Sequence, residues 1–350
     1  MTQLPSCLLI LVSLVSAFNF YIIFSPPGVV QNKPILSFNK ERSFKILQLT
    51  DLHLGEDPDT DWAPAADQKT FSLLRKLIKV ENPDLIVLGG DQLTGNNVDE
   101  NATVYYDLLA DLLESFSIPY ALIFGNHDDM DLEVRLPNDS LVIKPAKTSR
   151  RQLLRSDQRH AHSLVQEGPS HVFGVSNYML SVYQGDNVKL QVVLLDSGGG
   201  SLPQEIVQSQ LDWYQSQRLA GVDAVAFQHI PTHQFQFANN KTCKGYKGED
   251  ITPLESDPVG EVSVLDVHFL AVGHNHGNSY CCPRSDNLHV CFGRHSGYGG
   301  YGHWDKGGRV FEIMALDDNA VEWRSWVRME SGHVMDEYNP YPNTTVSIFI

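Results

Sequence analysis

Positive charge is scarce in this 350-residue sequence, and the shortage narrows the kinds of partner that suit it. Lysine and arginine number 26 against 42 aspartate and glutamate residues, so the formal net charge is −16. A protein of that sign is repelled by phosphate backbones and by anionic membrane surfaces. We therefore expect no nucleic acid as a structural partner.

Cysteine is also scarce, and its spacing excludes a cysteine-rich zinc site. Of five cysteines, Cys7 lies in an apolar leader, and the others are Cys243, Cys281, Cys282 and Cys291. They lack the paired CxxC spacing of such a site. Adjacent cysteines rarely bridge each other, so we expect Cys281 and Cys282 to divide between Cys243 and Cys291, in either pairing. Disulfides of this kind indicate an oxidising compartment.

Apolar runs long enough to cross a bilayer are absent beyond the N-terminus. The first apolar stretch extends from Cys7 to Phe24 and is closed by two prolines. Small residues at 15–17 suit a cleavage site, so residues 1–17 are predicted to be a signal peptide. The alternative is an uncleaved anchor over residues 7–24, since such a length just spans a bilayer.

Export also agrees with the glycosylation sequons, which are at Asn101, Asn138, Asn240 and Asn343. Asparagine in this sequence context accepts glycans in the secretory pathway. We expect a secreted or lumenal protein or, if the leader is retained, one anchored to a membrane by its N-terminal segment. The sequence predicts no particular oligomeric state.

Short apolar runs alternate with amphipathic stretches from residue 44 onward, which is typical of a layered α/β domain. The runs predicted as strands are FKILQLT, DLIVLGG, YALIFGN, YMLSVY, LQVVLLD, AVAFQHI, HFLAVGH, HVCFG, RVFEIMAL and VEWRSWV. Helical periodicity occurs in Gln68–Val80, Tyr105–Phe116 and Pro203–Gln217. We place one domain at 44–330, after a lead-in at 18–43 and before a tail at 331–350.

A polar insertion from Met130 to about Ser170 interrupts the alternation and is expected to contain a helix, for which Ser149–Val165 is the candidate stretch. This segment contains His160 and His162. Residues two apart on a helix point in different directions, so we interpret this pair as exposed surface.

Five of the apolar runs end, on the carboxyl side, in residues that can ligate a metal. These residues are Asp51 and His53, then Asp91, then Asn126 with His127 and Asp128, then His229, and finally His274 and His276. In open α/β sheets the ligand crevice lies beyond the carboxyl ends of the strands, so we expect the five endings to converge on one edge.

The predicted ligands are two carboxylates, one carboxamide and four imidazoles, with His127 left out. This mixed nitrogen and oxygen set suits divalent or trivalent iron, zinc or manganese. Seven ligands exceed what one ion usually accepts. If one carboxylate is shared, they suit two ions with positions left open for water and substrate.

The same residues resemble the motif series of the calcineurin-like metallophosphoesterase superfamily. The motifs are DLH at 51–53, GGD at 89–91, GNHD at 125–128, the lone His229 and GHNH at 273–276. The contexts FGRHSGYGGYG and QHIPTH are most similar to the purple-acid-phosphatase-like branch. The resemblance covers roughly Phe44 to Val327 and implies a layered sandwich of two mixed β-sheets flanked by helices.

The resemblance also implies a role for each site residue. The first ion would be held by Asp51, His53 and His276, the second by Asn126, His229 and His274, with Asp91 as the bridge. His127, together with Asn126, would contact the substrate phosphoryl group, and Asp128 would orient the His127 ring. One departure concerns colour: true purple acid phosphatases carry a tyrosine ligand where this chain has Thr94, and they lack the histidine found here at His53. We therefore expect the non-purple ligand set.

The segment GYGGYG at 297–302 matches the GxGxxG pattern of dinucleotide sites, but it precedes a strand-like run and opens no helix. We interpret it as a loop beside the metals, with Arg294 and His295 as candidate substrate contacts.

The expected activity is hydrolysis of phosphomonoesters on small phosphorylated substrates, by in-line attack of a hydroxide bridging two metal ions. One alternative is a phosphodiesterase acting on a nucleotide or lipid head group. Another is a catalytically silent binding protein that keeps the metal site.

Overall fold

The computed structural model describes residues 33–58, 60–98, 102–136, 138, 140–237, 242–256, 265–284, 288–317 and 320–341. The predicted leader and three of the sequons, Asn101, Asn240 and Asn343, lie outside these residues. Asn138 lies within them and is exposed. Within the described part of the chain, no helix combines the length and apolarity that crossing a bilayer requires.

One mixed sheet has six strands, in the order β15-β14-β13-β2-β3-β4. The strands are β2 (Ser43–Leu49), β3 (Leu85–Gly89), β4 (Tyr120–Ile123), β13 (Gly307–Ala315), β14 (Val321–Met329) and β15 (Val334–Tyr338). β2, β3 and β4 are parallel, and the remaining pairings are antiparallel. Every residue of β3 is buried, as expected for a parallel strand covered on both faces.

The second mixed sheet has seven strands, in the order β1-β7-β8-β9-β10-β12-β11. The strands are β1 (Leu36–Ser37), β7 (Tyr178–Gln184), β8 (Asn187–Leu194), β9 (Asp223–Phe227), β10 (Phe269–Val272), β11 (Cys281–Pro283) and β12 (His289–Phe292). β8, β9, β10 and β12 run parallel to one another. All ten predicted strands therefore exist, and they form a sandwich of two mixed sheets.

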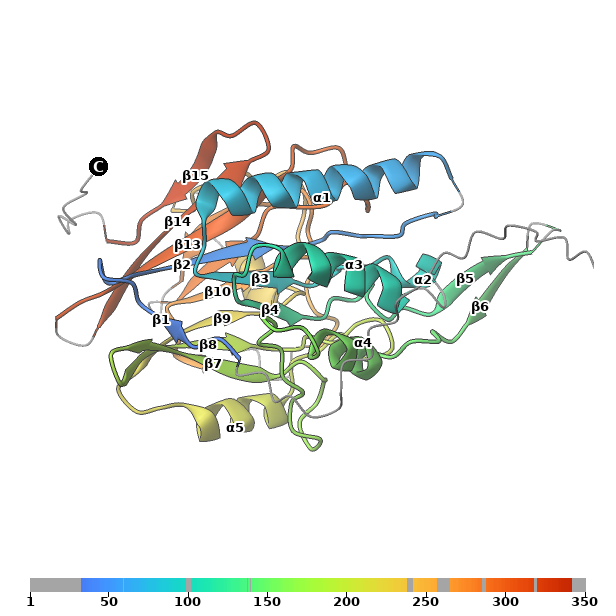
Figure 1. Cartoon of the computed structure of the whole chain (residues 1–350). Helices are drawn as coiled ribbons and strands as arrows, with labels where there is room; N and C mark the ends of the chain where they lie inside the picture. Colours follow the sequence, from blue (N-terminus) through green and yellow to red (C-terminus); the bar gives the residue numbers. More distant parts are fainter. Residues whose placement is uncertain are drawn as a thin grey trace, which may run out of the picture. The chain divides into compact units, whose positions relative to one another are not determined.

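Helices flank the sandwich. They are α1 (Trp62–Glu81), α2 (Gly95–Val98), α3 (Ala102–Glu114), α4 (Arg150–Asp157), α5 (Gln208–Gln217) and the 3₁₀ helix η2 (His233–Phe237). α1 and α3 lie beside the six-stranded sheet, whereas α5 lies beside β7 and β8 on the other side (Figure 1). The α/β expectation is confirmed.

Aromatic side chains join the two sheets in the core. Phe311 of β13 stacks on Phe269 of β10 with ring centroids 4.2 Å apart, and it meets Phe227 of β9 edge-on at 5.8 Å. Such pairs add stabilisation beyond the area that they bury. These contacts hold β13 of the six-stranded sheet against β9 and β10 of the seven-stranded sheet.

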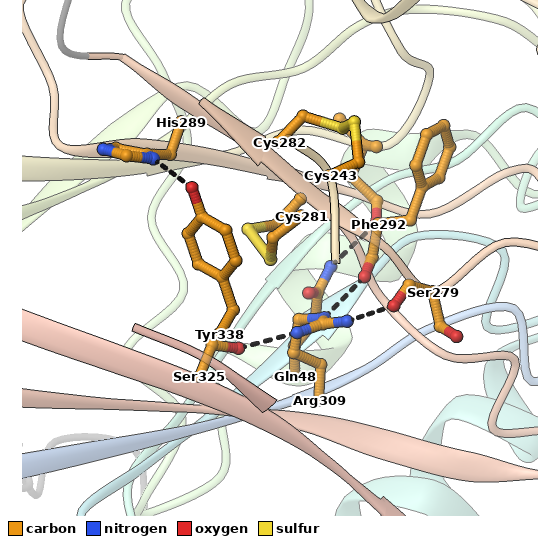
Figure 2. Close-up of a disulfide and its surroundings, with 12 residues drawn as sticks. Gln48, Cys243, Ser279, Cys281, Cys282, His289, Phe292, Arg309, Ser325 and Tyr338 are labelled. Atoms are coloured by element: carbon orange, nitrogen blue, oxygen red, sulfur yellow. Dashed lines mark hydrogen bonds between the residues drawn. A yellow bond between two sulfur atoms is a disulfide. The ribbon is translucent and has the colours of Figure 1, made fainter. Parts of the chain in front are cut away.

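A fully buried arginine and two disulfides fasten the same region (Figure 2). Arg309 of β13 donates from Nε to the carbonyl of Phe292 at 2.6 Å and from Nη1 to the hydroxyl of Ser325 at 2.8 Å, and it also bonds the carbonyl of Ser279. The disulfides are Cys243–Cys282 and Cys281–Cys291. The prediction that Cys281 and Cys282 divide between the other two cysteines is confirmed, and the pairing is now assigned.

One predicted helix begins later than expected. α5 starts at Gln208, because the carbonyl of Pro203 instead accepts the N–H of Gly199 in a turn at 3.2 Å. Proline therefore lies before this helix and not in its first turn.

The insertion contains a hairpin and a short helix. The hairpin is β5 (Leu132–Arg135) with β6 (Leu141–Lys144), and α4 ends at Asp157, well before the predicted Val165. His162 lies beyond the helix, half-buried, with its Nδ1 2.7 Å from Glu114. The prediction of an exposed helical histidine pair is wrong here, because the chain turns back to place His162 beside α3.

Candidate metal centre

The predicted ligands follow strands of both sheets at their carboxyl ends. β2, β3 and β4 of the six-stranded sheet and β9 and β10 of the seven-stranded sheet lead into them. The residues are Asp51, His53, Asp91, Asn126, His229, His274 and His276. The sequence predicts a single edge, whereas the structure combines the edges of two facing sheets. The site is therefore supported from both halves of the sandwich.

Two groups of possible ligand atoms lie there. The first ligand group is Asp51, His53 and His276, and the second ligand group is Asp91, His229 and His274. Within each group, one ligand atom per residue lies within 4.8 Å of the others. Asn126 adjoins the second group, because its Oδ1 is 2.9 Å from Nδ1 of His274.

Asp91 lies at the boundary between the groups. Its Oδ2 is 3.1 Å from Nε2 of His229 and 3.6 Å from Nε2 of His53 in the first group. Its Oδ1 accepts the backbone N–H of His127 at 2.7 Å, which leaves Oδ2 directed at nitrogens of both groups. A carboxylate shared by two ions needs such a position.

Four of these residues adopt the left-handed backbone conformation. φ is 57° at Asp51, 47° at His53, 52° at Asp91 and 70° at His274. Aspartate and histidine enter this region more readily than most residues, yet each such residue costs on the order of 1–3 kcal/mol. Four strained backbone conformations among the predicted ligands indicate that function, and not folding alone, maintains them.

Hydrogen bonds on the outer side of the rings fix which nitrogen faces the site. Nδ1 of His229 donates to the carbonyl of Gly89 at 2.9 Å, and Nδ1 of His276 donates to that of Tyr301 at 2.8 Å. In the neutral rings the Nε2 lone pairs therefore face inward, toward carboxylate oxygens 3.1 and 3.6 Å away. Lone pairs that face anionic oxygens repel unless a cation lies between them.

A second observation agrees with a cation at this place. Among the described residues, the neutral His229 ring leaves its buried Nε2 without a hydrogen-bond donor, because Oδ2 of Asp91, 3.1 Å away, is itself an acceptor. A buried polar atom without a partner is costly and requires an explanation such as a bound ion. The donor set therefore fits a pair of metal ions bound through nitrogen and oxygen.

Burial and charge compete in setting the pKa values of the ligands. Burial lowers the pKa of His229, but the carboxylates of Asp91 and Asp51 outweigh it and raise the pKa to about 9. Burial, and next the neighbouring His229, lower the pKa of His274 to about 3. Burial also lowers the pKa of His53 well below its usual value. In the metal-free protein His229 thus holds a proton that a metal ion must displace.

Asp128 has other partners than the predicted one. Its Oδ2 accepts the N–H of Gly125 at 2.8 Å and that of Asp91 at 3.1 Å, and its Oδ1 accepts that of Leu93 at 3.1 Å. Nδ1 of His127 is buried and has no partner among the described residues. Burial, and next the charge of Asp91, raise the pKa of Asp128 to about 7. Asp128 therefore joins the loops after β3 and β4 and does not orient the His127 ring.

Arg294 and His295, the predicted substrate contacts, are buried, with exposures of 4% and 1%. Nε of Arg294 donates to the carbonyl of Asp305 at 2.7 Å. The His295 ring packs on His276 with centroids 3.9 Å apart, and its Nδ1 is 2.8 Å from Nζ of Lys306. Both side chains are therefore buried against other protein groups, and His295 packs on the predicted ligand His276.

Thr94 stands where true purple acid phosphatases carry a tyrosine ligand, and it lies beside His53, the other residue that departs from their pattern. Its Oγ1 is 3.2 Å from Nδ1 of His53, and its side chain is buried. The two residues that distinguish this chain from true purple acid phosphatases therefore contact each other, and the hydroxyl holds the His53 ring.

Tyr301 and Glu249 support the site without having been predicted. The Tyr301 ring stacks on His276 at 4.0 Å and 15°, its hydroxyl donates to Glu249 at 2.9 Å, and Glu249 accepts the N–H of Gly277 at 2.5 Å. The sequence feature that could have indicated the role of Tyr301 is the glycine-rich segment 297–302, which contains it. At Gly300, where φ is 72°, a Cβ would lie 2.6 Å from Cε1 of His276, so this loop packs directly on a ligand.

The sequence pattern of the calcineurin-like phosphoesterase family matches residues 44–278. Phosphatase DCR2 of Saccharomyces cerevisiae is 27% identical over 81% of this chain, which spans about half (54%) of that protein. Probable inactive purple acid phosphatase 29 of Arabidopsis thaliana is 27% identical over 89% of this chain and 89% of its own. The 3′,5′-cyclic adenosine monophosphate phosphodiesterase CpdA of Haemophilus influenzae is 28% identical over 41% of this chain and 48% of its own. Because the family match spans more than half of the chain, the protein belongs to the calcineurin-like phosphoesterase family and is a hydrolase of phosphoric ester bonds.

Proposed function

We propose that this protein is a secreted or lumenal phosphatase that hydrolyses phosphomonoesters with two bound metal ions, which are iron, zinc or manganese. The observation that carries the proposal is the adjacency of two ligand groups at Asp91, whose Oδ2 faces histidine nitrogens of both. When bound, two ions supply Lewis acidity that activates water and neutralises charge on the phosphoryl oxygens.

The chain's own residues would hold and orient the substrate. The His127 backbone is fixed by its N–H bond to Asp91, and its half-buried ring meets the His53 ring edge-on at 4.9 Å. Its Nδ1 lacks a partner among the described residues, so that nitrogen has no competing bond. We assign His127 to bind a phosphoryl oxygen and to supply a proton to the leaving oxygen. Asn126, next to it, would contact both the second ion and the substrate.

Placement in the secretory pathway is supported by two features of the described residues. Both disulfides suit an oxidising compartment. The sequon residue Asn138 is exposed near the hairpin of β5 and β6, where a glycan has room.

Two rival functions have support of their own. The partial similarity to a protein named as a cyclic nucleotide phosphodiesterase favours diester cleavage. The similarity to a protein named as a probable inactive phosphatase favours a silent relative. Against silence, the seven predicted ligands are all present and lie in two adjoining groups.

The test compares an aryl phosphate with its bis-aryl diester on purified protein loaded with each candidate metal. We expect the monoester to be hydrolysed faster and Asp91→Asn to lose at least one ion and nearly all turnover. Faster turnover of the diester would select the phosphodiesterase. Absence of turnover with both ions bound would select the silent binding protein.

A further inference from the structure

Arg150 opens helix α4 of the insertion, yet its side chain is only 2% exposed. The capping box at Ser149 fixes this first turn, because the Ser149 side chain accepts from the backbone of Gln152 while the Gln152 side chain bonds back to Ser149. A buried arginine needs partners for its positive charge and for its donors. The question is what those partners do.

All three guanidinium nitrogens of Arg150 donate hydrogen bonds. Nε bonds Oδ1 of Asp129 at 2.9 Å, and Nη1 bonds Oδ1 of Asp196 at 2.6 Å. Nη2 bonds three backbone carbonyls, those of Gly125 at 2.8 Å, Gly198 at 3.2 Å and Gly199 at 2.6 Å. We call Arg150 with Asp129 and Asp196 the arginine clamp.

The clamp joins loops from the two sheets. Gly125 and Asp129 lie in the segment after β4 of the six-stranded sheet, whereas Asp196 and Gly199 lie in the segment after β8 of the seven-stranded sheet. The first of these segments carries Asn126 and His127. The guanidinium thus bonds this segment on both sides of Asn126 and His127, at Gly125 and at Asp129.

The second loop also packs on a predicted ligand. At Gly199, where φ is 86°, a Cβ would lie 2.3 Å from Cβ of Asn126. The Gly199 carbonyl, held by Arg150, therefore fixes a backbone that closes one side of Asn126. On its other side, Oδ1 of Asn126 is 2.9 Å from Nδ1 of His274.

The aspartates of the clamp are themselves held in place. Asp129 accepts the Ser201 hydroxyl at 2.5 Å, and Asp196 accepts the N–H groups of Val175 at 2.7 Å and Ser176 at 3.1 Å. Lysine could not reproduce the planar fork that bonds two carboxylates and three carbonyls at once. The arrangement requires an arginine.

We propose that Arg150 is a positioning residue for the second metal ion, acting through Asn126. This inference rests on the proposed function, since it takes Asn126 as a ligand. It makes the insertion part of the metal centre: without Arg150, the GNHD segment keeps the Asp129–Ser201 bond but loses the guanidinium bonds that join it to the loop after β8. None of the contacts described for the first ligand group involves Arg150.

The experiment titrates metal-free protein with Mn²⁺ by calorimetry for wild type, Arg150→Lys and Asp129→Asn. The matched control is Arg328→Lys, which disturbs another arginine that bonds a buried carboxylate; its bonds go to Glu81 of α1 and to the carbonyl of Gly332 instead of to a ligand segment. We expect affinity for the second ion to fall about 10–100-fold in both clamp variants and affinity for the first ion to stay at the wild-type value. The control should lower the unfolding midpoint and leave both affinities unchanged.

Hydrogen exchange on the metal-free proteins gives a readout independent of metal and activity. Faster exchange at the His127 amide, which donates to Asp91, is expected in the clamp variants alone. Wild-type affinity for both ions, or an equal loss at both sites, would overturn the positioning role. If Arg150→Lys does not fold, Asp129→Asn decides by the same criteria. If wild type binds two ions but cleaves no ester, the proposed phosphatase fails, whereas selective loss of the second ion would still support the clamp.

Discussion

The two ligand groups differ in how firmly their rings are enclosed. In the first group every residue is buried, and the His276 ring lies between His295 at 3.9 Å and Tyr301 at 4.0 Å. Thr94 holds the remaining ring, that of His53. Each imidazole of this group therefore has a fixed partner that is not itself a predicted ligand.

The second group is partly open. His229 is fully buried and bonded to a backbone carbonyl, but His274 is half-buried, and its Nδ1 contacts Asn126, another predicted ligand. His127, assigned to the substrate, follows Asn126 directly. We infer that the first group holds a resident ion and that the second group faces the substrate. Support for the second group comes from farther away, through the arginine clamp.

If the second ligand group faces the substrate, the largest loss of turnover without loss of metal is expected from substitution of His127. Glutamine at this position keeps polarity but cannot pass a proton as imidazole does, so turnover of an aryl phosphate should fall about 10²–10⁴-fold in His127→Gln. Both ions should remain bound, because His127 belongs to neither ligand group. Steady-state kinetics with metal analysis on the same sample measures both quantities.

The control for this variant is His162→Gln, which replaces a half-buried histidine paired with Glu114. It should keep wild-type turnover. Unchanged turnover in His127→Gln would remove the proton-donating role, and loss of an ion would show that the residue holds metal instead.

A smaller effect concerns pH. The pKa of His229 is raised to about 9, so below that pH the second ion must displace a proton, and its affinity should rise with pH by up to about tenfold per unit between pH 7 and 9. Burial lowers the pKa values of His53 and His276, so both are already neutral at pH 7 and the first ion should show little change. Competition with a chelator at several pH values measures both affinities. Equal slopes for the two ions would contradict the assigned difference between the groups.

The gathering of the predicted ligands could be anticipated from the sequence, because each of them closely follows a strand. An apolar run such as residues 85–89 fixes the strand, and the polar residue after it must lie at the carboxyl end of the sheet. The ten strands and the convergence of the ligands need only this local information. The family resemblance implied two sheets, but the assignment of each strand to one of them comes from the structure.

The supporting contacts could not be predicted, because they join segments far apart in the chain. Arg150 reads as an ordinary basic residue at a helix start, and only the folded chain brings it to Asp196 and Gly125. Asp128 illustrates the opposite error: its neighbour in sequence, His127, is not its partner, because backbone N–H groups of the adjoining loops occupy the carboxylate.

The most direct test of the central claim is anomalous diffraction from crystals of the protein grown with Mn²⁺. The account predicts two separate peaks, one at Asp51, His53 and His276 and the other at His229, His274 and Asn126, with Asp91 in contact with both. A single peak, or peaks away from these side chains, would contradict it.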